Sequence, residues 1–257
     1  MKVLILGAGY GTRLYPLTIS TPKALLEVGG RTILDRLFDN IFSVKECTGA
    51  YIVSNDLFYE NFCEWAKKKK NEENFSDKII EVVNDGTMSN EDRLGAIGDI
   101  VFGVEQFDIS EDFMVVGSDN LFDFRLNDFY AFALSKNNKA CLALHDIEDI
   151  EMAHMYGIAI VEEGTSRILD FQEKPKEPKS TLAATAVYFY PKEKLKELKE
   201  YMKTDFSKDA PGNFIKWLST KEDVYGYVFS EKWYDIGDKN SLKKADKELT
   251  EKEKGKE

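Results

Sequence analysis

Long apolar runs are missing from this sequence of 257 residues. No run approaches the ~20 residues that a membrane-spanning helix needs. The apolar start at residues 1–7 is also too short for a signal peptide, and no cleavage-like site follows it. We therefore expect a cytoplasmic chain of globular composition, without a membrane partner.

Positive charge is scarce as well. The chain has 35 Lys and Arg against 46 Asp and Glu, which gives a net charge of -11. An acidic chain is poorly suited to nonspecific binding of nucleic acid or of anionic membranes, so neither is an expected partner. If the protein handles phosphates, a few local cations must bind them, with help from a divalent cation.

Cysteine and histidine are few. The three cysteines, Cys47, Cys63 and Cys141, lie far apart and form no CxxC motif. They are typical of small hydrophobic residues in a reducing compartment. The two histidines, His145 and His154, have no partner at the spacing of a metal site or a catalytic triad. We interpret both as structural or surface residues.

What the sequence does contain is a regular alternation of strands and helices. Apolar patterns predict strands near 3–6, 51–53, 79–83, 113–116 and 140–144, with helices at 33–42, 56–70, 97–107 and 129–135 between them. This order predicts an α/β, Rossmann-like, doubly wound and mostly parallel sheet. After residue 145 the pattern changes, because 156–161 and 167–171 form an expected β-hairpin.

The expected organisation is one domain over 1–240, made of a first half at 1–145 and an elaborated second half at 146–240. A charged helix and a frayed tail are expected over 241–257, with fraying from residue 251 onward.

The first expected strand runs into a glycine loop, Leu-Gly-Ala-Gly-Tyr-Gly-Thr-Arg at residues 6–13. In open α/β sheets, ligands bind beyond the carboxyl ends of the strands. Glycines let backbone N–H groups approach an anion closely. Arg13 can bind phosphate oxygens with two N–H groups, and Lys23 adds a point charge. The loop therefore predicts a phosphate site.

Two familiar glycine loops do not fit the spacing. The dinucleotide fingerprint needs a third glycine at position 12 or 14, where Thr12 and Leu14 stand, and Pro16 interrupts the helix that should follow. The P-loop needs Gly-Lys-Ser/Thr, which this sequence lacks. An NAD-dependent enzyme is therefore the less favoured interpretation.

The sequence instead resembles the sugar-1-phosphate nucleotidylyltransferases, also called nucleotide-sugar pyrophosphorylases. The resemblance rests on the segments 9–18 (GYGTRLYPLT) and 22–30 (PKALLEVGG). It continues in chain order through 94–99 (LGAIGD), Asp119-Asn120, Tyr156-Gly157, 173–175 (EKP) and 233–237 (WYDIG). It thus covers nearly the whole chain, and it is close to thymidylyl- and uridylyltransferases.

The resemblance implies a glycosyltransferase-A-like nucleotidyltransferase fold, with NTP bound by the first half and sugar phosphate by the second. The implied reaction converts an NTP and a sugar-1-phosphate into an NDP-sugar and pyrophosphate, and it needs Mg²⁺. The implied catalytic cations are Arg13, Lys23 and Lys174, and the implied metal ligands are Asp119 and Asp235. The implied nucleotide-binding residues are Gly7, Ala8, Gly9, Gly11, Thr12, Asn84 and Gly95. The implied sugar-phosphate residues are Asn120, Tyr156, Gly157, Glu173 and Thr185.

Three positions depart from the family pattern. Ser118 replaces the usual glycine before the metal aspartate, Ala186 stands where Thr-Gly is common, and the loop 84–93 is longer than in thymidylyltransferases. The sequence favours dTTP or UTP but does not fix the base or the sugar. A regulatory subunit that only binds nucleotide sugar stays open, as do CTP or GTP with another phosphorylated acceptor, and a homo-oligomer.

Overall fold

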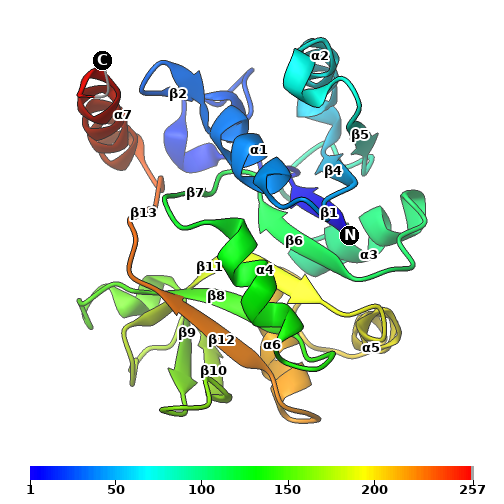
Figure 1. The fold of residues 1–257 in the computed structure, drawn as a ribbon, viewed down its shortest axis with the longest axis vertical. Helices are drawn as coiled ribbons and strands as arrows, with labels where there is room; N and C mark the ends of the chain where they lie inside the picture. Colours follow the sequence, from blue (N-terminus) through cyan, green and yellow to red (C-terminus); the bar gives the residue numbers. More distant parts are fainter. Residues whose placement is uncertain (256–257) are drawn as a thin grey trace.

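The computed structural model describes residues 1–255 as a central nine-stranded sheet flanked by helices, with two small two-stranded sheets (Figure 1). The strands are β1 (Lys2–Leu6), β2 (Glu27–Val28), β3 (Arg31–Thr32), β4 (Gly49–Ser54), β5 (Ile79–Asn84), β6 (Phe113–Gly117), β7 (Leu121–Phe122), β8 (Cys141–Asp146), β9 (Gly157–Val161), β10 (Ile168–Glu173), β11 (Leu182–Tyr190), β12 (Tyr225–Phe229) and β13 (Trp233–Tyr234). The two small sheets are β2-β3 and β7-β13. The helices are α1 (Ile33–Ser43), α2 (Tyr59–Lys70), α3 (Ala96–Gln106), α4 (Leu126–Leu134), α5 (Lys194–Met202), α6 (Pro211–Ser219) and α7 (Lys239–Lys254).

The first half of the chain forms a parallel sheet in the order β6-β1-β4-β5. Strand β11 pairs antiparallel with β6 and joins this sheet to β8, β9 and β10 of the second half, while β12 runs parallel to β8. The strands that carry the glycine loop and Asp119, β1 and β6, are neighbours. Their carboxyl ends therefore meet at the same edge, as an α/β site requires.

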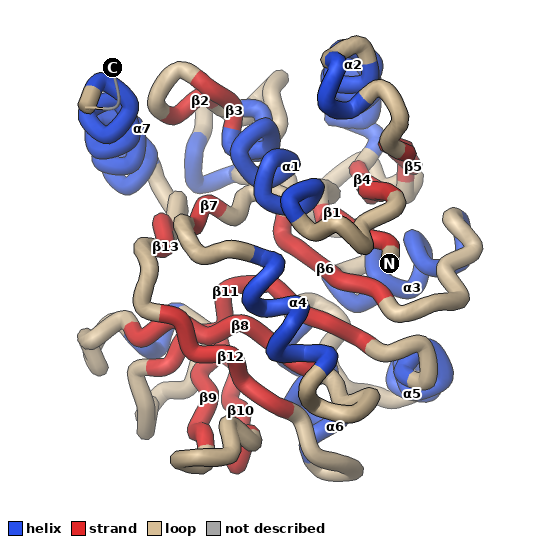
Figure 2. Tube along the Cα trace, in the orientation of Figure 1, coloured by secondary structure: helices blue, strands red, loops and turns tan. Residues whose placement is uncertain are grey.

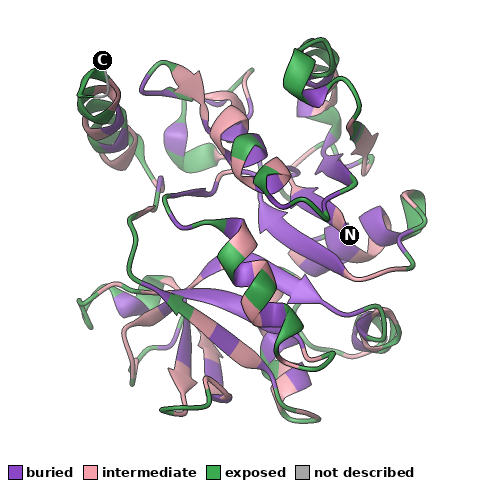
Figure 3. Cartoon of the chain, viewed as in Figure 1, coloured by how far each residue is buried: buried purple, intermediate pink, exposed green. Residues whose placement is uncertain are grey.

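The central strands β1, β4 and β6 are buried on both faces, which explains their continuous apolar runs (Figure 3). In β1, Val3 and Ile5 pack into the core that contains α1, α2 and α4, whereas Leu4 packs into the core that contains α3, α5 and α6. Alternate side chains of a strand point to opposite faces. Figure 2 shows the helices of the two layers around the strands.

Local signals place the helix starts. Thr32 caps α1 by accepting a hydrogen bond from the N–H of Asp35 at 3.0 Å, as its position before the apolar pattern predicts. Asp238 caps α7, and Ser241 completes a capping box with it. No helix in the described part of the chain is both long enough and apolar enough to cross a bilayer.

Helix α7 confirms the charged helix expected at the end of the chain. It begins at Lys239, two residues before the expected start, and continues to Lys254. Ala245 and Leu249 bury an apolar face in a small core with Val28 and Ile236, and this packing stabilises the helix. The last two residues of the predicted tail, 256–257, lie outside the described residues.

Candidate functional site

The loop after β1 contains a row of unpaired backbone N–H groups. Gly7 donates its N–H to the carbonyl of Val53 at 2.8 Å, so this glycine continues the sheet. Within the described part of the chain, the N–H groups of residues 8–11 donate no hydrogen bond. The amide of Asn55 fixes the loop by donating to the carbonyl of Ala8 at 2.9 Å. Successive free N–H groups of this kind can form an anion-binding concavity.

The glycines of this loop serve different purposes. A Cβ on Gly7 would lie 3.0 Å from the ring of Phe62 and from the carbonyl of Val53. Gly11 has a φ of +60°, where L side chains are strained. A Cβ on Gly9 would meet nothing within 4 Å. Packing therefore requires a glycine at position 7 and backbone conformation requires one at position 11, while Gly9 keeps the loop open to a ligand.

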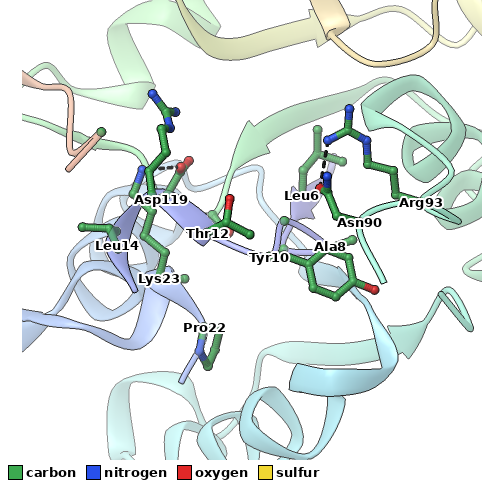
Figure 4. Close-up of a pocket in the computed structure, with 17 residues that line it drawn as sticks. Leu6, Ala8, Tyr10, Thr12, Leu14, Pro22, Lys23, Asn90, Arg93 and Asp119 are labelled. Atoms are coloured by element: carbon green, nitrogen blue, oxygen red, sulfur yellow. Dashed lines mark hydrogen bonds and ion pairs between the residues drawn. The ribbon is translucent and has the colours of Figure 1, made fainter. Parts of the chain in front are cut away.

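The loop borders a pocket of about 300 Å³. Lys23 and Asp119 lie on one side of it, and Asn90 and Arg93 lie on the other (Figure 4). Its lining contains most of the residues expected at the nucleotide: Gly7, Ala8, Gly9, Gly11, Thr12, Arg13, Lys23 and Asp119, together with Leu6, Tyr10, Leu14, Pro22, Ala24, Asn90, Arg93, Ser118 and Gly237. The polar backbone and the cations are the donors that an anion requires.

The two aspartates expected at the metal are both held by donors. Lys23 Nζ lies 2.7 Å from Asp119 Oδ2, and the hydroxyl of Tyr156 donates to Asp235 Oδ2 at 2.6 Å. Burial opposes the ionisation of Asp119, but Lys23 and then Arg13 lower its pKa below the usual value. Burial, and next the bond to Asp235, raise the pKa of Tyr156, so its hydroxyl remains a donor.

Both aspartates line a second pocket of about 140 Å³, beside Lys23 and Tyr156. Within the described residues there is no group of three or more His, Cys, Asp or Glu side chains that could hold a metal ion. Mg²⁺ usually takes one or two carboxylates and completes its shell with water and phosphate oxygens. A pair of aspartates at a phosphate pocket suits that ion.

Asn120 connects the same pocket to distant segments. Its Nδ2 donates to the carbonyls of Thr185 and Ala186, the latter at 3.2 Å, and its Oδ1 accepts from Trp233 Nε1 at 3.2 Å. The Thr185 hydroxyl donates to the carbonyl of Ala143 at 3.2 Å. The side chains of Asn120 and Thr185 are therefore both held by hydrogen bonds to other protein groups where they line the pocket.

Ala186 lies at an irregularity of β11, where the register shifts between Ala184 and Tyr188. Its φ is +54°, a conformation that glycine adopts more easily. This position is one of the three at which the sequence departs from the family pattern. The structure keeps the glycine-like backbone there but adds a methyl group to the pocket lining.

The remaining residues of the second half do not line either pocket. Lys174 is exposed, and its N–H donates to the carbonyl of Tyr156 at 2.9 Å. The carboxyl of Glu173 packs against Gly157 and Gly212, where a Cβ would lie 2.8 Å and 2.5 Å from its Oε2. Burial raises the pKa of Glu173. Lys174 is thus an exposed cation whose backbone is bonded to Tyr156, a residue of the second pocket.

Two residues expected at the nucleotide lie elsewhere. Asn84 donates from Nδ2 to Asp56 at 2.7 Å, and its Oδ1 accepts from the N–H of Gly86 at 2.8 Å. Gly95 packs its Cα against the backbone of Lys208, and a Cβ there would lie 2.7 Å from that carbonyl. Neither lines the pocket of the glycine loop.

Their place at the pocket is taken by Asn90, Arg93 and Tyr10, which sequence reasoning did not select. The available signal was the polar loop 84–93 directly before the glycine motif at 94–99. Its residues could not be ranked without knowing how the loop folds back over the end of β1.

Comparisons with known proteins give independent information on the family of this chain. The chain matches the family model described as nucleotidyl transferase over residues 2–252. It is 28% identical over 237 residues to a candidate mannose-1-phosphate guanyltransferase of Sulfolobus acidocaldarius. This match covers 92% of this chain and 60% of that relative. It is 28% identical over 264 residues to a glucose-1-phosphate adenylyltransferase of Fervidobacterium nodosum, which covers 96% of this chain and 60% of that relative.

The chain therefore spans about 60% of the length of these curated relatives. Among solved structures, a UDP-glucose pyrophosphorylase complexed with UDP-glucose has a TM-score of 0.82. The similarity covers 98% of both chains at 21% identity and supports the α/β nucleotidyltransferase fold. On the family match over most of its length, and with its glycine loop and pocket in place, the chain belongs to the nucleotidyl transferase family.

Proposed function

We propose that the protein joins an NTP to a sugar-1-phosphate and releases pyrophosphate. A phosphate oxygen of the sugar phosphate would attack the α-phosphorus of the NTP. The new O–P bond forms as the bond from the α-phosphorus to the bridging oxygen of the β-phosphate breaks, and pyrophosphate leaves with that electron pair. Such a displacement depends on alignment and on neutralising charge, more than on covalent chemistry.

The single observation that carries the proposal is the glycine loop with its free N–H groups at residues 8–11, bordered by Arg13 and Lys23. These N–H groups would bind the triphosphate through its oxygens. Arg13 has no ion-pair partner among residues 1–255, so its guanidinium is available to the departing pyrophosphate. In an acidic chain, this local concentration of donors is what an NTP needs.

The sugar phosphate would enter from the second half. Lys174 is exposed beside Tyr156, so its ammonium is accessible to an incoming phosphate. Asn120 and Thr185 line the pocket in which the sugar would lie. Asp119 and Asp235 would hold Mg²⁺, and a bound Mg²⁺ neutralises charge on the α-phosphate. Lys23 would then release Asp119 and turn to the phosphates.

Within this reaction we propose dTTP or UTP as the favoured nucleotide. The support is the resemblance of the segments at 9–18 and 22–30 to those of thymidylyl- and uridylyltransferases, although they also resemble those of guanylyltransferases. The named relatives include a guanyltransferase and an adenylyltransferase, so the competing nucleotides must be measured. A regulatory subunit without activity is less well supported, because Arg13, Lys23, Asp119 and Asp235 are all present.

The test is pyrophosphate release across a grid of dTTP, UTP, GTP, ATP and CTP with several hexose-1-phosphates, at several millimolar Mg²⁺. We expect turnover with at least one pair and the matching NDP-sugar by mass spectrometry. Binding of nucleotide without product from any pair would contradict the catalytic proposal and favour the regulatory alternative.

A further inference from the structure

The side of the pocket opposite Lys23 and Asp119 is formed by Asn90 and Arg93 (Figure 4). Both belong to the loop between β5 and α3, which reaches over the end of β1. If the triphosphate occupies the N–H groups beside Lys23, the nucleoside must extend along the pocket toward this opposite side. The direction assigned here to the bound nucleotide rests on the proposed function.

Arg93 is held in place but is not covered. Its Nη1 donates to Asn90 Oδ1 at 3.1 Å, and its Nη2 lies 3.3 Å from Asp209 Oδ1. The side chain is 46% exposed. Two partners thus restrict a long, flexible side chain, and the rest of its five donors remain accessible to a ligand.

The chemistry available here is donation. A guanidinium has donors and no acceptor. Asn90 Oδ1 accepts from Arg93, and its Nδ2 group, which makes no hydrogen bond within residues 1–255, adds a further donor. A base carbonyl satisfies such donors, whereas an exocyclic amino group would face them with further N–H groups and leave both sides unpaired.

We propose that Arg93, positioned by Asn90 and Asp209, reads a carbonyl oxygen of the nucleobase, so that the protein selects uracil, thymine or guanine over cytosine and adenine. The relevant atoms are O4 of the pyrimidines and O6 of guanine. The bases with such a carbonyl include those of both nucleotides proposed above. A single residue of the loop 84–93, Arg93, would thus give this protein a base preference different from that of relatives that use adenine.

The test uses matched nucleotide pairs. ITP and ATP differ at the six-position, and UTP and CTP differ at the four-position. In each pair the first nucleotide has a carbonyl beside a ring N–H, and the second has an amino group beside an unprotonated ring nitrogen. We measure kcat/KM by pyrophosphate release, and Kd by calorimetry with Mg²⁺ and without sugar phosphate. Wild type should favour the carbonyl member of at least one pair by roughly five- to 150-fold, the range of a good arginine–base contact.

Arg93→Met keeps the length of the side chain and removes its donors. It should bring this ratio close to one, mainly by weakening the carbonyl member. Asp209→Asn removes the charge that positions Arg93, so it should reduce the ratio by a smaller factor. Arg31→Met is the control, because Arg31 pairs with Asp39 and lines neither pocket, and it should leave the ratio unchanged.

The outcomes separate this inference from the proposed function. A wild-type ratio at or below one, or an unchanged ratio in Arg93→Met, would overturn the role of Arg93 even if the enzyme turns over. Selective binding of the carbonyl nucleotides without turnover would support the role and contradict the proposed reaction. Absence of binding to all four nucleotides would overturn both.

Discussion

Lys23 and Asp119 neutralise each other at the centre of the candidate site, with 2.7 Å between Nζ and Oδ2. One is the cation expected at the pyrophosphate, and the other is a carboxylate expected at the metal. The hydroxyl of Tyr156 has the same relation to Asp235. Both aspartates are therefore oriented by a protein donor before substrate arrives, and both must exchange that donor for a metal ion if magnesium binds.

Replacement of either aspartate should remove activity without unfolding the protein. We expect Asp119→Asn and Asp235→Asn to lower turnover by about 10²- to 10³-fold, because each removes one charged metal ligand. EDTA should abolish the activity of wild type. The measurement is pyrophosphate release, with circular dichroism as the check on folding. Asp77→Asn, an exposed aspartate paired with Lys78, is the control. Full activity in chelator would contradict the metal assignment.

A side chain at Gly9 should block the phosphate site while the fold persists. The Cβ of Gly9→Val would enter open space in the pocket, so we expect a stability change within roughly 0.5 kcal/mol. Mg-NTP at a hundredfold excess over Kd should stabilise wild type by about 2.7 kcal/mol and should not stabilise the variant. Thermal melting with and without nucleotide measures both effects.

Gly103→Ala provides the contrasting case. Its Cβ would lie 2.6 Å from Leu4 Cδ1, so it should destabilise the apo protein by roughly 1–3 kcal/mol and leave the nucleotide site intact. If Gly9→Val melts early like Gly103→Ala, or if it still responds to nucleotide, the loop does not bind phosphate as we describe.

The two exposed cations should act on different substrates. Arg13→Ala should weaken the binding of NTP and pyrophosphate, and Lys174→Ala should weaken the binding of sugar phosphate. Each variant should lose roughly 1.5–3 kcal/mol of binding free energy through loss of a charge-assisted contact. Calorimetric isotherms for each ligand measure this separation. Lys176→Ala removes a neighbouring exposed lysine and should change neither. An effect of Lys174→Ala on NTP alone would reverse the roles.

Asp99 should make stability depend on pH. Its side chain is buried, with 7% of the residue exposed, and Oδ1 has no partner. Burial, and next the charge of nearby Asp85, raise its pKa to about 7. An acid whose pKa is raised by folding stabilises the fold while it stays protonated. That contribution is present below the unfolded pKa of ~3.9 and is lost as pH rises toward 7.

Urea unfolding at pH 5 and pH 7 measures this effect. Relative to Asp99→Asn, which cannot titrate, the unfolding free energy of wild type should fall by up to about 2.7 kcal/mol between these pH values, at 1.36 kcal/mol per unit. Asp77→Asn should keep the wild-type dependence. Parallel pH profiles for wild type and Asp99→Asn would contradict the raised pKa.

Local patterns were enough to predict the main strands and helices of the first half of the chain and the hairpin after it, but not the short strands β2, β3 and β7. The apolar run at 3–6, the cap at Thr32 and the hairpin around residue 164 are set by neighbours in sequence, so the order of strands and helices was predictable. The glycine loop was also recognisable, but the role of each glycine was not. Gly11 is required by its positive φ, whereas at Gly9 a side chain would enter the open space of the pocket. Only the folded loop distinguishes these two roles.

The sequence was least informative where the chain folds back on itself over long distances. Asn84 and Gly95 contact Asp56 and Lys208, and neither lines the pocket of the glycine loop. Arg93 was not selected because no local pattern says where a polar loop will lie. The short β13, which brings Asp235 beside Tyr156, was predictable only from its motif.

Asn120 has a consequence for how the protein acquires its activity. Its side chain joins segments 65, 66 and 113 residues further along the chain, at Thr185, Ala186 and Trp233. Contacts of such long sequence separation form slowly and close large loops. A chain that has folded only its parallel strands would have the glycine loop but no fixed second pocket. We therefore expect refolding to restore nucleotide binding before it restores turnover, with a delay that reflects the docking of the last strands onto Asn120.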